Sequence, residues 1–466
     1  MGAAETAPLF KSHRRKAGHA GAFTLCKTDS LDKHYNLAQA IRSVPRDTLV
    51  VPARGTTYAK YGGGHPPFLR RQSFGAPDPR VQKAAGCRSG RDAAGGTGNG
   101  APCAFSPVAA DVPLALYGAG NMGRLARDFL ATVGRKPVMV IDRNARRLAQ
   151  EPSWTGERLV HPDEMAEFAK DGLRIAVCVV TAPYVPIERS LQQLGFEDIV
   201  PFYDLAESFR GVHPLSNGWF AAPLTAFDRE KTAEVLARWD DDVSRAHHLQ
   251  FLAWRRLREE WVFDAAPTPD CARFFIPEVA RVLNDDEFLL DAGAHDGSVS
   301  QAFVRHTKGA FRRIAAIEPD PSNRARLEAN LQFWLPADPR VTVYDCALAD
   351  DEGEALFHDG LDYASQLSPT GRMRVTTRPL DALDLSPTFV KIHLEGGELT
   401  ALKGARETLL GNRPIVAATV YHNADGIWKT PHWLMQLLPN YRFLFRAHSW
   451  CGTGGVVYAI PNERSA

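Results

Sequence analysis

Residues 288–297 read FLLDAGAHDG, a short apolar run that passes directly into a loop of small and acidic residues. The run is typical of a buried strand, and a helix is expected after the loop. A second apolar run, 314–317, ends in Glu-Pro-Asp-Pro at 318–321. Glycines let a ligand approach the backbone, and an acid one strand later can accept the hydroxyls of a ribose. The residues expected around such an adenosine-type ligand are Asp291, Gly293, Ala294, Gly297 and Glu318.

Apolar runs and helix-like segments alternate through the rest of this half of the chain. Further strands are expected at 341–344, 389–394, 414–422, 441–448 and 455–460. This alternation predicts a doubly wound α/β sheet, in which ligands bind outside the carboxyl ends of the strands. The glycine loop lacks the GxxxxGKS or GxxxxGKT pattern, which excludes a P-loop, whereas NAD stays open as a ligand.

Four ionisable residues lie at the carboxyl ends of two of these strands, and they are His393, Glu395, Glu398 and His422. Any of them could take the proton of an acceptor hydroxyl, a step that contributes about 10²–10⁴-fold to a rate. The structural alternatives are helix N-terminal charge for the two glutamates and a hydrogen-bonded strand-end histidine for His422. Imidazoles and carboxylates together can also bind a metal ion, but no spacing demands one, and no metal site is predicted.

A second nucleotide-type pattern lies earlier in the chain. Residues 114–117 are apolar, GAGNMG follows at 118–123, and another apolar run at 138–141 ends at Asp142. A strand, a GxGxxG loop, a helix, a strand and an acid in this order predict a Rossmann-like unit with an anion site at the helix N-terminus. The candidate nucleotide-binding residues are Gly118, Gly120, Gly123 and Asp142. An inherited fold that binds no ligand is an equally good interpretation.

The chain is expected to divide into a tail at 1–110, a Rossmann-like domain at 111–212, a helical connector at 213–283 and the doubly wound domain at 284–466. The connector has apolar residues at helical spacing. Its adjacent histidines, His247 and His248, cannot point to one helix face, which argues against a metal site there.

The tail is basic, with 16 Lys and Arg against six Asp and Glu, and it is rich in Gly and Pro. Such a segment buries too little apolar surface to offset its ordering entropy, so we expect it to be mostly disordered. A targeting peptide, a myristoylation signal at Met1–Thr6, and contact with nucleic acid or lipid are alternatives. A dispensable tail is favoured over all three.

Residues 284–466 resemble the FkbM family of S-adenosylmethionine-dependent methyltransferases, and the resemblance extends back to about residue 111. The motifs that carry it are residues 291–297, 318–321, 390–398, 402–405 and 419–423. It implies a class I methyltransferase sheet. It also implies that the Gly293 loop holds the methionine part of the cofactor, Glu318 its ribose, and Asp345 and Cys346 its adenine. His393 stands where the family usually has an aspartate, so an imidazole takes the place of that carboxylate.

We therefore interpret the chain as an S-adenosylmethionine-dependent methyltransferase, and the resemblance favours O-methylation of a sugar, glycan precursor or small-metabolite hydroxyl. The alternatives are a non-catalytic nucleotide-binding scaffold, and an NAD-dependent oxidoreductase or epimerase using the 118–123 loop. We expect a small-molecule or carbohydrate acceptor, with a nucleotide or nucleotide-sugar at the first domain.

Total charge is nearly balanced, with 55 Lys and Arg against 54 Asp and Glu, which argues against a nucleic-acid partner. No apolar run approaches the ~18–20 residues of a membrane span, and a cytoplasmic location is expected. Residues 363–368 lie in the long link between the strands at 341–344 and 389–394. We expect this link to be a loop that covers the acceptor.

Overall fold

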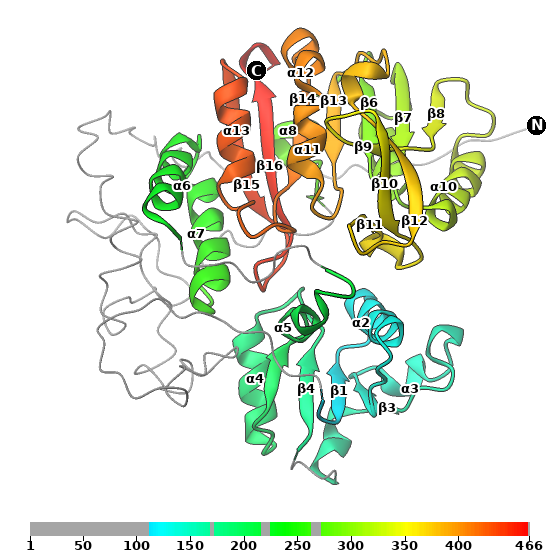
Figure 1. Ribbon diagram of the computed structural model, residues 1–466, viewed down its shortest axis with the longest axis vertical. Helices are drawn as coiled ribbons and strands as arrows, with labels where there is room; N and C mark the ends of the chain where they lie inside the picture. The colour runs from blue at the N-terminus through cyan, green and yellow to red at the C-terminus, as the bar shows by residue number, and fades with distance from the viewer. Residues whose placement is uncertain (1–110, 168–171, 216–223, 262–271, 465–466) are drawn as a thin grey trace, which may run out of the picture.

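The computed structural model describes residues 111–167, 172–215, 224–261 and 272–464 (Figure 1). The predictions made for the tail at 1–110 lie outside these ranges. Within them the chain is a mixed α/β protein with two sheets built mainly from parallel strands and a third, smaller sheet.

The first sheet has five strands in the order β3-β2-β1-β4-β5, and all of them are parallel. Its strands are β1 (Leu114–Tyr117), β2 (Met139–Ile141), β3 (Leu159–Val160), β4 (Arg174–Val177) and β5 (Ile199–Pro201). Its helices are α2 (Asn121–Thr132), α3 (Ala145–Leu148), α4 (Tyr184–Gln193) and α5 (Phe202–Ala206). The glycine loop lies between β1 and α2, and β2 follows α2, as the sequence predicts. The strand β3 was not predicted, because two residues are too few to form a recognisable apolar run in the sequence.

The second sheet has seven strands in the order β15-β16-β14-β13-β6-β7-β8. The strands are β6 (Phe288–Ala292), β7 (Arg313–Ile317), β8 (Val341–Tyr344), β13 (Phe389–Ile392), β14 (Ile415–Thr419), β15 (Tyr441–Ala447) and β16 (Gly455–Pro461). Only β16 runs in the direction opposite to the other six strands, because it pairs antiparallel with both β14 and β15. The carboxyl ends of β6, β7, β13 and β14 therefore meet along one edge.

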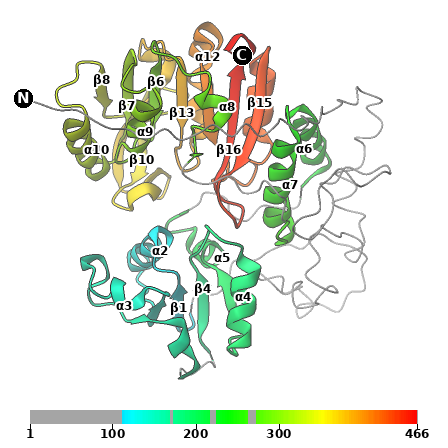
Figure 2. The same cartoon turned by 180° about the vertical axis from the view of Figure 1, so that it is seen from behind.

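Helices cover both faces of this sheet. The helices of this part of the chain are α8 (Pro277–Ala280), α9 (Ser298–His306), α10 (Pro321–Trp334), α11 (Glu398–Lys403), α12 (Arg406–Asn412) and α13 (Lys429–Leu437). Figure 1 shows α11, α12 and α13 in front of the sheet, and Figure 2 shows α8 and α9 on the opposite face. Successive strand residues alternate between two cores: Leu290 belongs to the same core as Leu402, whereas Leu289 belongs to the same core as Phe303. Burial on both faces explains the continuously apolar strands.

Two further helices, α6 (Ala226–Arg238) and α7 (Asp242–Leu257), lie in the range expected to be a connector. Their apolar residues Leu236, Trp239 and Phe251 join the same core as the strand residues of the seven-stranded sheet. The helices therefore pack against the β15 edge of that sheet. The division of the chain at residue 283 stays a prediction.

The third sheet lies in the link between β8 and β13, with strands in the order β11-β10-β12-β9. Its strands are β9 (Ala347–Leu348), β10 (Gly353–His358), β11 (Gln366–Leu367) and β12 (Met373–Arg378). The expectation of a long loop here is wrong for most of its length. Alternation of exposed and buried residues in β12 is typical of a sheet with one face in solvent.

The first sheet lies below the carboxyl edge of the seven-stranded sheet, with α2 and α5 nearest to it in both views (Figures 1 and 2). Asp204 of α5 forms a buried ion pair with Arg258, which follows α7, at 3.0 Å. Trp450 N, between β15 and β16, donates to Val180 O, after β4, at 2.7 Å.

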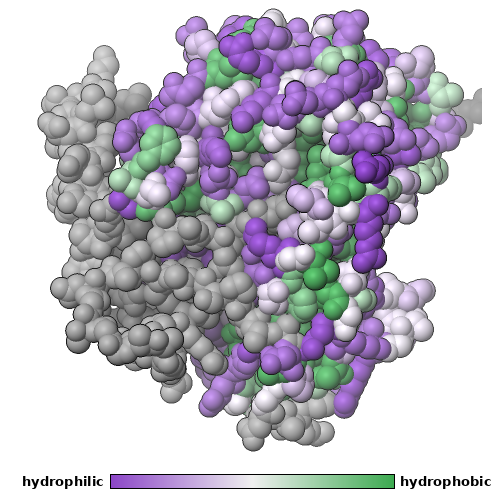
Figure 3. Space-filling model, viewed as in Figure 1, coloured by the Kyte–Doolittle hydropathy of each residue, from purple (hydrophilic) through white to green (hydrophobic). Residues whose placement is uncertain are grey.

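Large apolar side chains that are exposed in the described residues are scattered singly, as at Phe227 and Phe333. On the face drawn in Figure 3, hydrophilic residues separate the apolar groups. None of the described helices combines the length and apolar character needed to cross a membrane.

Candidate functional site

Asp291, at the carboxyl end of β6, is fully buried and paired. Lys391 Nζ on the neighbouring strand β13 lies 2.9 Å from Asp291 Oδ1, and Ser300 Oγ donates to Oδ2 at 2.8 Å. Lys391 Nζ also donates to Gly293 O at 2.7 Å. These bonds hold the start of the glycine loop against β13.

Gly293 sits where no side chain fits. Its φ is +70°, and a Cβ added there would lie 2.0 Å from His393 O. Such a φ and such a close approach both require glycine. The candidate cofactor loop therefore touches the backbone of His393 directly.

The rest of the loop is fixed by the next strand and helix. Ala294 is buried, and its N–H donates to Ile317 O at 3.0 Å. Gly297, with φ +82°, is the N-cap of α9, and a Cβ there would lie 2.8 Å from Leu327 of α10.

Glu318, directly after β7, is almost completely buried. Its Oε2 accepts from His295 N at 2.7 Å, and its Oε1 accepts from Asp320 N at 3.0 Å. Burial, partly offset by these bonds, raises the pKa of its carboxyl. Each carboxylate oxygen keeps a second lone pair that can accept a hydroxyl hydrogen.

Asp345 and Cys346 follow β8, one strand further out on the same edge. The Asp345 side chain is exposed and lies 2.6 Å from Arg324 Nη1. The Cys346 thiol is buried, which raises its pKa to about 11. The predicted cofactor residues of β6, β7 and β8 thus line one continuous edge.

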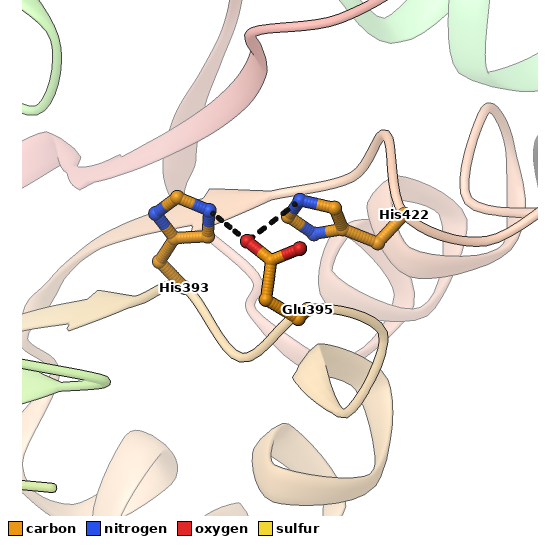
Figure 4. Close-up of side chains that lie close together, drawn as sticks. All are labelled: His393, Glu395 and His422. Atoms are coloured by element: carbon orange, nitrogen blue, oxygen red, sulfur yellow. Dashed lines mark ion pairs between the residues drawn. The ribbon is translucent and has the colours of Figure 1, made fainter. Parts of the chain in front are cut away.

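The four predicted catalytic residues meet next to this edge, at the ends of β13 and β14. Both His393 Nε2 and His422 Nε2 face Glu395 Oε1, at 3.0 Å and 3.2 Å (Figure 4). His422 Nδ1 lies 2.8 Å from Glu398 Oε1. The imidazole rings are nearly parallel, with centroids 5.1 Å apart.

Burial and charge give these residues different protonation states. Burial opposes a charge on His422, but Glu395 and Glu398 outweigh it and raise its pKa to about 9. Burial outweighs the attraction of Glu395 at His393 and lowers its pKa to about 4. His393 is thus neutral near pH 7, and with a side chain 18% exposed it is the most accessible of the four.

The nucleotide-type residues of the first sheet meet at the ends of β1 and β2. A Cβ at Gly123 would lie 2.1 Å from Gly118 O, so this glycine permits close packing of α2 on β1. Asp142 Oδ2 accepts from Ala119 N at 2.8 Å. A Cβ at Gly120 would meet no atom within 4 Å.

Three tyrosines lie around the cluster. The sequence analysis included Tyr421 in a family motif and Tyr363 in the segment expected to cover the acceptor, but it gave neither a role beside the cluster and did not single out Tyr203. Tyr421 OH lies 3.2 Å from His393 Nε2. Tyr203 of α5 and Tyr363 of the third sheet's loop lie close enough to Glu395 that its charge, after burial, raises their pKa values. No local pattern links the three tyrosines to one another, because they come from three distant segments of the chain. His247 and His248 are core residues, with ring nitrogens bonded to Ala447 N and Trp239 Nε1.

Comparison with known proteins places this site in a family. Residues 291–445 match the methyltransferase FkbM domain. The crystal structure of Methyltransferase FkbM from Methylobacillus flagellatus KT aligns with a TM-score of 0.53 and 20% identity, covering 75% of this chain and 90% of that one. The Precorrin-6y C5,15-methyltransferase from Geobacter metallireducens GS-15 aligns with a TM-score of 0.26 and 19% identity, covering 42% of this chain and 95% of that one.

No curated protein matches the sequence. The family match includes the glycine loop, Glu318, the His–Glu cluster and the strands β7, β13 and β14. Residues 291–445 therefore carry the match to a methyltransferase domain of the FkbM family.

Proposed function

We propose that this chain transfers a methyl group from S-adenosylmethionine to a hydroxyl of a sugar, glycan precursor or other small molecule. The observation that carries the proposal is the contact between Gly293 and His393 O, because it joins the cofactor loop to the His–Glu cluster. A methyl donor bound by the loop and an acceptor beside the cluster would then be neighbours, as direct displacement requires.

The chemistry of the loop fits this cofactor. Glu318 offers two carboxylate oxygens with lone pairs for the two ribose hydroxyls. The Gly293 loop would hold the methionine part, and Asp345 with Cys346 would lie beside the adenine. When bound, S-adenosylmethionine supplies an electrophilic methyl group on a sulfonium.

The His–Glu cluster would orient the acceptor and accommodate its proton. As the hydroxyl oxygen bonds to the methyl carbon, the carbon–sulfur bond breaks and its electron pair stays on sulfur. The hydroxyl proton leaves toward the cluster. His393 is the residue of the four best placed to meet an acceptor, because its side chain is 18% exposed, whereas those of Glu395, His422 and Glu398 are 10%, 3% and 2% exposed.

The test is calorimetric titration of S-adenosylmethionine into the full chain and into Glu318→Ala. Loss of two hydrogen bonds to a charged group is expected to weaken binding by at least about 10-fold. Glu328→Ala, an exposed position on α10, is the matched control and should bind normally. Unchanged affinity in Glu318→Ala would show that the cofactor does not bind at Glu318. A folded chain that binds no S-adenosylmethionine would overturn the proposal.

Methyl transfer is then measured as S-adenosylhomocysteine formed with a panel of sugars, nucleotide-sugars and hydroxylated metabolites. Cofactor binding without turnover on any acceptor would favour a scaffold. The glycine loop at 118–123 is proposed to hold the nucleotide part of such an acceptor, and titration with nucleotide-sugars and with NAD distinguishes the two kinds of ligand. Open space at Gly120 supports this assignment.

A further inference from the structure

We propose that His393, Glu395 and His422 form a binding site for a divalent transition-metal cation. Binding of the ion does not depend on the proposed function. Its role in catalysis, which is to hold and activate the acceptor hydroxyl, does rest on that function.

Three ligand atoms converge from two strands. Glu395 Oε1 lies 3.0 Å from His393 Nε2 and 3.2 Å from His422 Nε2, and the three atoms lie within 4.8 Å of one another. An ion about 2.0–2.2 Å from nitrogen and oxygen ligands separates neighbouring ligand atoms by roughly 3 Å. The two N···O distances therefore suit a shared ion after a small rotation of the imidazoles, which flank the carboxylate in Figure 4.

Glu398 provides the outer partner that metal-binding histidines typically have. It lies 2.8 Å from the far nitrogen of His422, so it fixes the ring with Nε2 turned toward Glu395. Glu398 is itself held by Thr419 Oγ1 at 2.8 Å and by Gly396 N at 3.0 Å. Glu398 thus orients His422, and His422 in turn presents its Nε2 to the proposed ion; both side chains are buried.

The backbone is bent to aim the carboxylate at both rings. Glu395 has φ +49° and Gly396 has φ +113°, and Asn423 Nδ2 closes the turn by donating to Gly396 O at 2.7 Å. A left-handed conformation is unfavourable for a glutamate. In this conformation, the Glu395 carboxylate lies between the imidazoles of His393 and His422.

The ligand types select the class of ion. Two imidazoles and one carboxylate suit ions such as Mn²⁺, Fe²⁺, Co²⁺ or Zn²⁺, whereas Mg²⁺ and Ca²⁺ prefer oxygen ligands. Three protein ligands leave coordination positions open for an acceptor oxygen. With the ion bound, the ligating nitrogens of His393 and His422 can no longer take the acceptor proton. The ion instead makes the bound hydroxyl lose its proton more readily, and the proton passes to solvent on the exposed side of His393.

The test is titration of Zn²⁺, Co²⁺, Mn²⁺ and Mg²⁺ into chelator-treated full chain, with calorimetry and the visible absorption of bound Co²⁺ as readouts. We expect a single ion per chain, with Zn²⁺ bound more tightly than Mn²⁺ and Mg²⁺ weakest. Glu398→Gln should weaken Co²⁺ binding by about 10–100-fold, and Glu395→Gln and His422→Ala by more than that.

The control is His432→Asn, which removes a histidine paired with Glu234 at 3.0 Å on the α6–α13 contact, outside the cluster. It should leave ion binding unchanged. Far-ultraviolet circular dichroism checks that each variant is folded, and His393→Asp, which keeps a ligand at the position, should shift preference from Co²⁺ toward Mg²⁺. No ion binding, or binding that survives Glu395→Gln, overturns the proposal.

S-adenosylmethionine is titrated into the same samples. Ion binding without cofactor binding would support the metal site and contradict the proposed function. Cofactor binding without ion binding would contradict the metal site and leave the proposed function supported.

Discussion

Gly293 joins the glycine loop to β13, because its backbone passes so close to His393 O that no Cβ fits. Gly293→Ala is therefore expected to lower the free energy of unfolding by at least about 1–3 kcal/mol, since a left-handed alanine adds strain to the clash. It should also weaken S-adenosylmethionine binding, because the loop must move away from His393. Chemical denaturation and calorimetry measure the two effects.

The matched control is Gly411→Ala in α12, where a Cβ would meet no atom within 4 Å. A helical alanine there is expected to leave stability unchanged or raise it by about 0.5–1 kcal/mol. Equal effects of the two substitutions would contradict the packing argument.

At the scale of single elements, charged side chains connect the glycine loop to the loop between β10 and β11. His295 of the glycine loop lies 2.7 Å from Asp362, in the loop between β10 and β11, and 3.4 Å from Asp296. Asp320 ties the same two regions, since its Oδ2 accepts from Ser365 Oγ at 2.6 Å and from Gly360 N at 2.9 Å. The loop expected to act as a lid is thus fastened to the proposed cofactor site.

This contact predicts a dependence of stability on pH. Burial opposes the charge on His295, but Asp296 and Asp362 outweigh it and raise its pKa to about 9. The folded-state pKa of His295 lies above the ordinary value of about 6.5. The contribution of its ion pairs to the free energy of unfolding is therefore fully present below about pH 6.5 and is lost as pH rises through about 9. Asp362→Asn should therefore destabilise the protein at about pH 6, by about 1 kcal/mol because the pair is partly exposed, and by less at about pH 10.

Urea denaturation at the two pH values measures the difference. Asp351→Asn, at an exposed position outside these contacts, is the control and should show no such dependence. A deficit for Asp362→Asn that is the same at both pH values would show that His295 is not the group responsible.

At the scale of the whole molecule, a buried ion pair links α5, beside the first sheet, to the residue that follows α7, beside the second. Arg258 Nη2 lies 3.0 Å from Asp204 Oδ1, and both side chains are inaccessible to solvent. Asp204→Ala leaves a cation buried without this partner and is expected to lower the free energy of unfolding by about 3–5 kcal/mol. Thermal and urea denaturation followed by tryptophan fluorescence measure the loss.

The exposed pair Arg147–Glu151, at 2.6 Å, provides the comparison. Glu151→Ala should cost no more than about 0.5 kcal/mol, since solvent screens the pair. A cost for Asp204→Ala that is as small as this would mean that the buried ion pair does not stabilise the fold.

Much of the fold follows from local patterns in the chain. Residues 288–292 and 313–317 form the strands expected from their apolar runs, and each ends in the loop that its glycines or its Glu-Pro-Asp sequence predicts. Glu318 and Asp320 cap and close these loops through bonds to residues close by in the sequence or one strand away. Short-range hydrogen bonding and burial on both faces were sufficient for these features.

Other features depended on which segments pair in space. The segment 353–378 forms a small sheet instead of a loop, because β10 gains its partners from β11 and β12. The same holds for the site, since His422 lies 29 positions after His393 in the chain. Parallel pairing of β13 with β14 and the left-handed turn at Glu395 bring both imidazoles to one carboxylate oxygen. Sequence alone yields the residue types at each strand end, and only the pairing of strands determines which of them lie next to one another.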